Sequence, residues 1–153
     1  MTDSMIGKKA PEFNLPTDGD GSASLADFKG KKLVIYFYPK DDTPGCTQES
    51  KDFRDEVKSF EAANTVILGV SKDSVKKHDK FKEKYCLPFK LISDEETKMI
   101  QDYGVWKEKS MYGKIYMGIE RSTFVIDENG VITNVWRNVK VGGHVKEVLD
   151  AVK

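Results

Sequence analysis

The hydrophobic positions of the chain form two kinds of pattern, continuous apolar runs and stripes at helical spacing. Residues 33–38 and 65–70 are runs rich in β-branched and aromatic side chains, which is typical of strands covered on both faces. Between them, apolar residues recur at helical spacing, at Phe53, Val57 and Phe60. This spacing predicts a helix from Cys46 to near Asn64. A strand, a helix and a strand in this order predict a right-handed parallel crossover.

The rest of the pattern predicts short elements in alternation. They are, in chain order, a turn over 18–22, a helical turn over 25–28, a helix over 75–85, a strand over 89–92, a helix over 95–103, strands over 122–127 and 131–137, and a closing helix over 145–152. Pro88 and Gly104 end the two middle helices, and residues 127–130 are a hairpin signal. Residues 106–118, rich in Met, Tyr and Gly, are predicted to form an irregular, mobile loop. We therefore expect an α/β fold with a central mixed β-sheet flanked by helices.

Composition narrows the choice of partners and compartment. The chain has 153 residues, a length that predicts a single domain over 1–153 with a substantial core. Lys plus Arg number 25, as do Asp plus Glu, and the lysines are scattered, so nucleic acid is not an expected partner. The longest apolar run is far too short to span a membrane, and residues 1–9 lack the apolar core of a signal peptide. With two cysteines, too few for a disulfide scaffold, the chain is expected to be cytoplasmic.

Cys46 follows the first apolar strand and opens the helix. The first turn of a helix has backbone N–H groups without intrahelical partners and carries partial positive charge, and both features stabilise a thiolate. Because cysteine reactivity follows thiolate content, this position makes Cys46 a candidate nucleophile. The hydroxyl of Thr43, three residues earlier, can donate to the thiolate or orient a substrate oxygen. The competing interpretation is that Cys46 is a small buried apolar residue, as most free cysteines are.

The residues around Cys46 resemble a known family. The spacing Pro39-x-x-x-Thr43-x-x-Cys46 is the signature of the peroxiredoxins, and the whole string 37–47 is similar to their bacterioferritin-comigratory (PrxQ) branch. Further segments follow the family's order along nearly the whole chain, namely 7–15, 46–49, 53–55, 69–71, 73–74, 87–89, 93–94 and 120–127. The resemblance implies a thioredoxin-like α/β fold.

The resemblance also implies a thiol-dependent peroxidase. In this family the cysteine thiolate attacks a peroxide oxygen, releases water or an alcohol and becomes a sulfenic acid. The expected substrates are hydrogen peroxide and organic hydroperoxides, and the expected electron donor is thioredoxin or another thiol. No cofactor is expected, and the resemblance favours a monomer. An alternative from another class is a peroxide-sensing switch or chaperone-like binding protein that uses the same cysteine and stops after a single oxidation.

The same resemblance implies roles for residues near Cys46. Arg121 matches the family's active-site arginine and would hold the thiolate and the developing oxyanion; without the motif it would be interpreted as a surface residue of an edge strand. Pro39 would shield the sulfur from water, or simply end the strand. Backbone N–H groups near Gly45 are candidate donors to the oxygens of the transition state. Glu49 would order the pocket through hydrogen bonds, and the competing interpretation is a solvated helix carboxylate.

The chain departs from the family at the resolving cysteine. Many members of the branch carry a second cysteine five residues after the peroxidatic one, and Ser50 and Lys51 occupy that stretch here. Cys86 lies at the end of the next predicted helix, one turn past the position near Lys82 that the resemblance favours. Both helices start at one sheet edge, so Cys46 and Cys86 are expected toward opposite edges, beyond the reach of a disulfide. We expect a one-Cys cycle with Cys86 as a packed helix-end residue; a resolving role for Cys86 is the alternative.

The histidines do not complete a metal site. His78 and His144 with the two cysteines lack zinc-ligand spacing, so no metal is expected. His78 is predicted on the flank of a helix face, and His144 close to the start of the last helix. The chain has no Cys-x-x-Cys, which argues against a dithiol reductase or isomerase.

Overall fold

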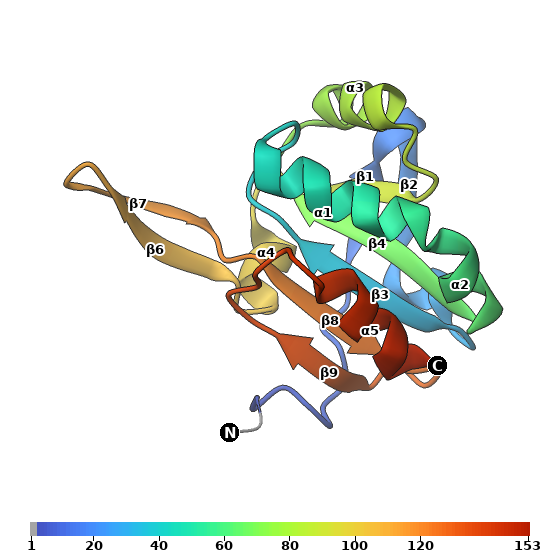
Figure 1. Cartoon of the computed structure of the whole chain (residues 1–153). Helices are drawn as coiled ribbons and strands as arrows, with labels where there is room; N and C mark the ends of the chain where they lie inside the picture. Colours follow the sequence, from blue (N-terminus) through green and yellow to red (C-terminus); the bar gives the residue numbers. More distant parts are fainter. Residues whose placement is uncertain (1–2) are drawn as a thin grey trace.

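A computed structural model describes residues 3–153 and contains a seven-stranded β-sheet with helices packed against it (Figure 1). The strands of this sheet are β1 (Asn14–Thr17), β2 (Gly21–Ser24), β3 (Lys32–Phe37), β4 (Thr65–Ser71), β5 (Lys90–Ser93), β8 (Ser122–Ile126) and β9 (Ile132–Trp136). Their order across the sheet is β2-β1-β5-β4-β3-β8-β9. The helices are α1 (Pro44–Asp55), α2 (Val57–Ala62), α3 (Val75–Tyr85), α4 (Lys98–Asp102) and α5 (His144–Val152), with 3-10 turns at Asp18–Asp20 and Leu25–Phe28.

β3 lies at the centre of the core because both of its faces are covered. Successive residues of a strand point to opposite sides of the sheet. Val34 and Tyr36 belong to the core that the strands share with α1, α2, α3 and α5. Leu33, Ile35 and Phe37 belong to the core on the other side, together with residues of α4 and the N-terminal segment. This two-sided burial explains the continuous apolar run and confirms the predicted central strand.

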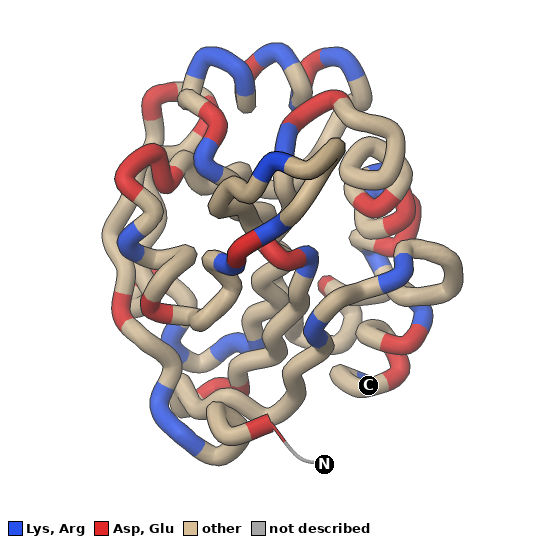
Figure 2. Tube along the Cα trace, turned by 90° about the vertical axis from the view of Figure 1, so that its left-hand side faces the viewer, with Lys and Arg blue, Asp and Glu red and all other residues tan. Residues whose placement is uncertain are grey.

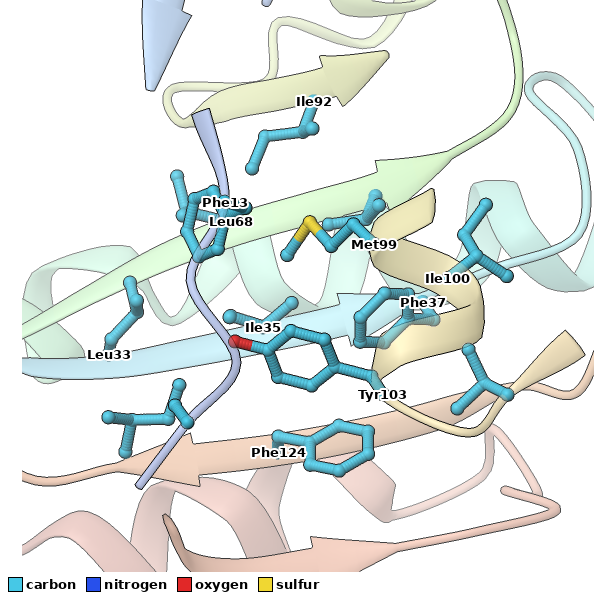
Figure 3. Packing of buried hydrophobic residues seen from close by; sticks show 14 of the residues in the cluster. Phe13, Leu33, Ile35, Phe37, Leu68, Ile92, Met99, Ile100, Tyr103 and Phe124 are labelled. Carbon is cyan, nitrogen blue, oxygen red and sulfur yellow. The ribbon is translucent and has the colours of Figure 1, made fainter. Parts of the chain in front are cut away.

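The core on the side away from α1 is built around three aromatic rings (Figure 3). Phe37, Tyr103 and Phe124 lie with their ring centroids 5.2–5.6 Å apart in tilted or edge-to-face geometry. Such pairs contribute about 0.5–1.5 kcal/mol each beyond the apolar area that they bury. The hydroxyl of Tyr103 donates to the carbonyl of Pro11 at 2.8 Å. This bond ties the N-terminal segment across the core and stabilises the support beneath β3.

The sheet is mixed, as predicted. β3, β4 and β5 pair in parallel, and β8 pairs antiparallel with β3 and with β9. Parallel neighbours need crossover connections, which α1 with α2 provide between β3 and β4, and α3 provides between β4 and β5. The carboxyl ends of β3, β4 and β5 therefore meet at one edge of the sheet, where α1 and α3 begin (Figure 1).

The long helix predicted from Cys46 to near Asn64 is interrupted. α1 ends at Asp55 and α2 begins at Val57, because Glu56 leaves helical geometry with φ −107° and ψ 8°. Apolar spacing continues across the break, with Phe53 and Phe60 in the same core, so the pattern of residues does not reveal it.

The prediction of an irregular loop over 106–118 is wrong. This segment forms a hairpin of β6 (Trp106–Met111) and β7 (Lys114–Ile119), paired from Trp106 opposite Ile119 to Met111 opposite Lys114. The turn residues Tyr112 and Gly113 both have positive φ, 53° and 77°, as a two-residue hairpin turn of this hand requires. Tyrosine is not a usual residue there, and both faces of the hairpin are largely exposed, so no alternation of apolar and polar residues marks the strands. The turn predicted over 18–22 is confirmed by the 3-10 turn at Asp18–Asp20, which connects β1 to β2 in a second hairpin that the sequence did not predict.

Candidate active site

Cys46 lies in the first turn of α1, beside the carboxyl end of β3. Thr43 is the N-cap residue, with extended backbone, and Pro44 is the first helical residue, where its missing N–H leaves no helical bond unmade. Cys46 follows two positions later, among backbone N–H groups without intrahelical partners. Its side chain is 1% exposed and belongs to the core of Tyr36 and Phe53. The helix-start position is confirmed, and the sulfur is also buried.

Arg121 reaches Cys46 from the start of β8. β8 pairs antiparallel with β3, with Ser122 opposite Phe37, so the residue before β8 lies at the edge where β3 ends. Arg121 Nη2 is 3.5 Å from Cys46 Sγ, and Nη1 donates to Glu49 Oε1 at 2.8 Å. One guanidinium therefore contacts the sulfur and a carboxyl one turn further along α1. This is the arrangement that the family resemblance implied for Arg121.

Gly45 leaves room for this guanidinium. A Cβ atom at position 45 would lie 3.0 Å from Arg121 Nη2, closer than side-chain atoms normally approach. The backbone of Gly45 does not have the positive φ that would itself favour glycine. The close approach of Arg121 is therefore the reason that a glycine suits this position.

Glu49 is fully buried, so the interpretation as a solvated helix carboxylate is wrong. Burial raises the pKa of Glu49 to about 7, against the opposing effect of Arg121. Its second oxygen, Oε2, has no hydrogen-bond partner among the described residues. Burial lowers the pKa of Arg121, but the neighbouring Glu49 and Cys46 raise it by more, so the guanidinium stays charged at any working pH.

The contacts of Thr43 and Pro39 are with the backbone and with a neighbouring pocket. The hydroxyl of Thr43 donates to the carbonyl of Lys40 at 2.8 Å, so its hydrogen is directed at the backbone and not at the sulfur. Pro39 is half-buried and lines a pocket of about 670 Å³ together with residues of the β6–β7 hairpin, among them Met117 and Ile119. The shielding of Cys46 by Pro39 stays a prediction.

A buried polar network holds the turn between β3 and α1. Tyr38 donates its hydroxyl hydrogen to Asp41 Oδ1 at 2.6 Å, and His78 Nδ1 lies 2.6 Å from Asp41 Oδ2. His78 Nε2 is 2.9 Å from the carbonyl of Ile92, which can only accept, so this nitrogen carries a hydrogen. The backbone N–H of Asp41 donates to Asp73 Oδ2 at 2.8 Å. The predicted position of His78 on the face of a helix is confirmed, but no local sequence pattern predicts this network, since its partners lie far apart in the chain.

The pair formed by Asp41 and His78 holds a proton. Because Nε2 of His78 donates to a carbonyl, a hydrogen bond between Nδ1 and the carboxyl of Asp41 needs a second proton, on either Nδ1 or the carboxyl. A histidine cation that donates from both nitrogens to a carbonyl and a carboxylate meets this requirement. Burial lowers the pKa of His78, but the bond and charge of Asp41 raise it by more. Asp41, Asp73 and His78 place their side-chain ligand atoms within 4.8 Å of one another. Both ring nitrogens of His78 are engaged in hydrogen bonds, so this cluster has the chemistry of an ion pair and not of a metal site.

His144 is the first residue of α5, as predicted, and is buried beside the site. Its Nε2 lies 2.8 Å from the hydroxyl of Thr123 on β8. Burial, with a smaller effect of the Arg121 charge, lowers the pKa of His144 to about 4. The ring is therefore neutral at neutral pH.

Cys86 is a free thiol at the end of α3 and is exposed, so the prediction of a packed helix-end residue is wrong. It caps the helix in left-handed geometry with φ 53°, which turns the chain out of the helix. Arg54 Nη1 donates to the carbonyl of Tyr85 at 2.8 Å, so the end of α3 lies beside the last turn of α1. Cys46 is eight residues before Arg54, about 12 Å along the helix axis. Cys46 thus lies in the first turn of α1, whereas Cys86 follows the end of α3 that lies beside the last turn of α1.

Comparisons with known proteins agree with this geometry. Residues 6–135 match the model of the AhpC/TSA family. The "Putative peroxiredoxin bcp" of Coxiella burnetii is 57% identical over 144 residues, covering 94% of this chain and 95% of the relative. The "Peroxiredoxin Bcp" of Bacillus subtilis is 54% identical over 148 residues, covering 97% and 94%. A structure of Xanthomonas campestris Peroxiredoxin Q superposes with a TM-score of 0.88 at 47% identity, covering 92% of this chain and 89% of that one.

A thioredoxin-like α/β fold with a cysteine and an arginine in contact at one sheet edge is the structure of a thiol-dependent peroxidase, and the chain belongs to the AhpC/TSA family. Within it, the relatives named peroxiredoxin Bcp and the Peroxiredoxin Q structures place the chain in the bacterioferritin-comigratory branch. Its substrates are peroxides, and its electrons come from a thiol. Among the helices of residues 3–153, none combines the length and apolar character needed to cross a membrane.

Proposed function

We propose that Cys46 is the residue that this peroxidase uses to attack peroxide. The observation that carries the proposal is the 3.5 Å contact between Arg121 Nη2 and Cys46 Sγ. A permanent cation beside a sulfur favours the thiolate, which is the nucleophilic form. The first turn of α1 adds its unpartnered N–H groups and partial positive charge to the same effect.

In the first step the thiolate of Cys46 attacks the terminal oxygen of a hydroperoxide. The S–O bond forms as the O–O bond breaks, so the sulfur is oxidised to a sulfenic acid that keeps the peroxide's OH hydrogen. The other oxygen leaves as hydroxide or alkoxide and takes up a proton to become water or an alcohol. Negative charge moves from sulfur to oxygen in this step, and Arg121 with the N–H groups near Gly45 stabilises it. The X. campestris bacterioferritin comigratory protein is described as having alkyl peroxide reduction activity, which supports organic hydroperoxides as substrates here.

The neighbouring groups orient the reactants. Thr43 has its hydroxyl hydrogen on the carbonyl of Lys40, which leaves the oxygen free to accept from the OH of a bound peroxide. Glu49 fixes the guanidinium of Arg121 so that its second nitrogen faces the sulfur. Pro39, two residues after the end of β3, is proposed to shield the sulfur from water.

The sulfenic acid is then reduced by an external dithiol of the thioredoxin type. One partner thiol attacks Cys46, forming a mixed disulfide and releasing water; the second partner thiol displaces Cys46 as a thiol and leaves the partner oxidised. We propose a one-Cys cycle, which the different levels of Cys46 and Cys86 along α1 support. A resolving role for Cys86 is the alternative, and it requires part of α1 or α3 to unwind.

We further propose that residues 1–153 act as one domain and as a monomer, since Cys46, Arg121 and Glu49 all come from one chain. We also propose a cytoplasmic location, since two cysteines are too few for the disulfide scaffold of a secreted domain. No nucleic acid, metal or cofactor enters the proposed reaction.

Steady-state peroxide consumption with dithiothreitol tests this function. The wild type is expected to turn over many equivalents of hydrogen peroxide, and Cys46→Ser none, because serine keeps the volume but not the thiolate. Circular dichroism checks that the variant is folded. Consumption that stops after one oxidation would identify the sensor instead, and full activity of Cys46→Ser would place the chemistry elsewhere.

A further inference from the structure

The β6–β7 hairpin projects from the body of the protein at the end where α1 begins (Figure 1). It exposes large apolar side chains, with exposed fractions between 44% and 97%: Met111, Tyr112, Ile115, Tyr116 and Met117. Apolar groups clustered on a surface mark interaction sites. A two-stranded hairpin has little stability of its own. These exposed side chains add nothing to the buried core. The hairpin is therefore a candidate contact surface for another molecule.

A groove runs between this hairpin and the edge of the sheet. It has a volume of about 670 Å³, and four of its lining residues are lysines, namely Lys40, Lys72, Lys77 and Lys109. Two acidic residues also line it, Asp73 and Glu95. Asp73 is already engaged, since its Oδ2 accepts from the hydroxyl of Ser71 and from a backbone N–H. Four lysines against two acidic residues leave the lining of the groove with an excess of positive charge, although the whole chain has no net charge.

The groove lies at the same edge of the sheet as the reactive sulfur. β7 ends at Ile119, two residues before Arg121, and Pro39 links the groove to the turn that precedes α1. Figure 2 views the molecule from the side that carries the hairpin and shows both basic and acidic segments around it. Cys46 does not itself line the groove, so a protein that reduces it would place its own cysteine at this edge of the sheet, beside the groove.

We propose that the basic groove and the apolar hairpin together form the docking surface for a thioredoxin-type dithiol protein whose attacking cysteine is surrounded by acidic residues. The inference rests on the proposed function, because the docked partner performs the two thiol exchanges described above. The lysines of the groove attract the acidic rim and raise the association rate, and the hairpin supplies apolar contact once the partner has arrived. A small thiol needs neither feature.

Two electron donors separate docking from chemistry. Lys72→Glu with Lys77→Glu reverses two groove charges, and neither side chain touches Cys46 or Arg121. With an acidic bacterial thioredoxin as donor at low salt, this variant is expected to lose about tenfold or more in kcat/KM for thioredoxin. The kcat/KM of the wild type should decline with added salt, and that of the variant should decline less. With dithiothreitol as donor its turnover stays at the wild-type value. The matched control Lys29→Glu with Lys31→Glu reverses two lysines of a separate pocket, which three lysines and three acidic residues line, and keeps both activities.

The apolar half of the surface has its own variant. Met117→Ser is expected to lower kcat/KM for thioredoxin while keeping the salt dependence and the dithiothreitol activity. The docking surface would be refuted if all variants had the wild-type kcat/KM for thioredoxin, or if thioredoxin did not reduce the wild type. In either case, turnover with dithiothreitol would still support the proposed function. Concentration-dependent association of the chain that Met117→Ser abolishes would assign the hairpin to a second copy instead. A wild type inactive with dithiothreitol contradicts the proposed function itself.

Discussion

Arg121 divides its donors between two groups. Nη2 faces the sulfur of Cys46, and Nη1 holds the carboxyl of Glu49. Cys46 and Glu49 are three residues apart and lie on one face of α1, so a shift of the guanidinium changes both contacts together. Gly45, which has no Cβ atom, leaves the space that Nη2 occupies. We therefore expect the position of this planar cation to control the reactivity of the sulfur.

Gly45→Ala tests this positioning of the guanidinium. The added Cβ would lie 3.0 Å from Arg121 Nη2 and is expected to push the guanidinium away from the sulfur. Stopped-flow kinetics should show the second-order rate with hydrogen peroxide falling by on the order of tenfold or more. The free energy of unfolding should stay equal or fall, because the same shift weakens the bond of Arg121 to the buried carboxyl of Glu49 and offsets the better helix propensity of alanine. Gly142→Ala, with open space around its Cβ, is the control; an unchanged rate in Gly45→Ala would refute the role of the gap.

Glu49→Gln tests the buried carboxyl through the pH dependence of stability. The pKa of Glu49 is raised from 4.5 to about 7, so between these values the folded state keeps a proton that the unfolded state has released. Stability from this group is therefore full below pH 4.5 and is lost as pH rises toward 7. The loss is on the order of 3 kcal/mol, since one unit of pKa corresponds to about 1.4 kcal/mol.

Urea unfolding between pH 4.5 and 8 provides the measurement for this variant. The free energy of unfolding of wild type minus that of Glu49→Gln should fall with rising pH and level off above about 7. His144, whose pKa is lowered to about 4, acts in the opposite direction but is present in both proteins and cancels. Glu61→Gln, at an exposed position of α2, is the control and should show no such trend. A difference that does not vary with pH contradicts the raised pKa.

At the scale of elements, the turn that carries Cys46 is tied to two other parts of the fold. Asp41 connects it to α3 through His78, and His78 connects onward to β5 through the carbonyl of Ile92. The backbone of Asp41 is held by Asp73, which follows β4. The start of α1 is thus fixed by the two strands that follow β3 in the parallel part of the sheet.

His78→Leu removes this tie. It leaves the buried carboxyl of Asp41 without its cation, which should lower the free energy of unfolding by about 3–5 kcal/mol. Hydrogen exchange of amides in 39–46 should accelerate more than exchange in α5. Because pairing raises the pKa of His78, the wild-type advantage is full below pH 6.5 and declines as pH rises through the folded pKa. Breaking the exposed pair of Lys98 and Asp102 should change neither measurement; equal effects of the two substitutions would contradict a special role for His78.

Burial decides which elements the sequence reveals. β3 and β4 were predicted because both of their faces are covered, and their runs are continuously apolar. The β6–β7 hairpin was missed because its strands are exposed on both faces, so no core imposes a period on them. In the same way, Cys46 is marked locally by a strand that meets a helix, whereas the role of Arg121 came only from the family resemblance. The hydrogen bond between Asp41 and His78 joins residues 37 positions apart, so no local sequence pattern predicts it.

At the scale of the whole molecule, the parallel crossovers decide how the cysteines are related. α1 and α3 both begin at the edge where β3 and β4 end, so the start of one helix and the end of the other lie at different levels (Figure 1). Cys46, at the start of α1, is buried, and Cys86, at the end of α3, is exposed. An exposed free thiol is open to small reagents without being open to Cys46.

Cys86→Ser tests whether the second cysteine takes part in turnover. The variant is expected to keep wild-type peroxide turnover with dithiothreitol, because the one-Cys cycle uses an external thiol. Non-reducing digestion of peroxide-treated wild type should yield no peptide that joins Cys46 to Cys86. A quantitative cross-link formed within one turnover, and lost together with thioredoxin-supported activity in Cys86→Ser, would establish the two-Cys cycle.

The most direct test of the central role of Cys46 is the intact mass of the protein after one equivalent of hydrogen peroxide. The wild type is predicted to gain one oxygen atom, located at Cys46 by a sulfenic-acid trapping reagent and removed by dithiothreitol. Cys46→Ser is predicted to keep its mass and leave the peroxide unconsumed. The same gain of oxygen at the same rate in Cys46→Ser would contradict the account.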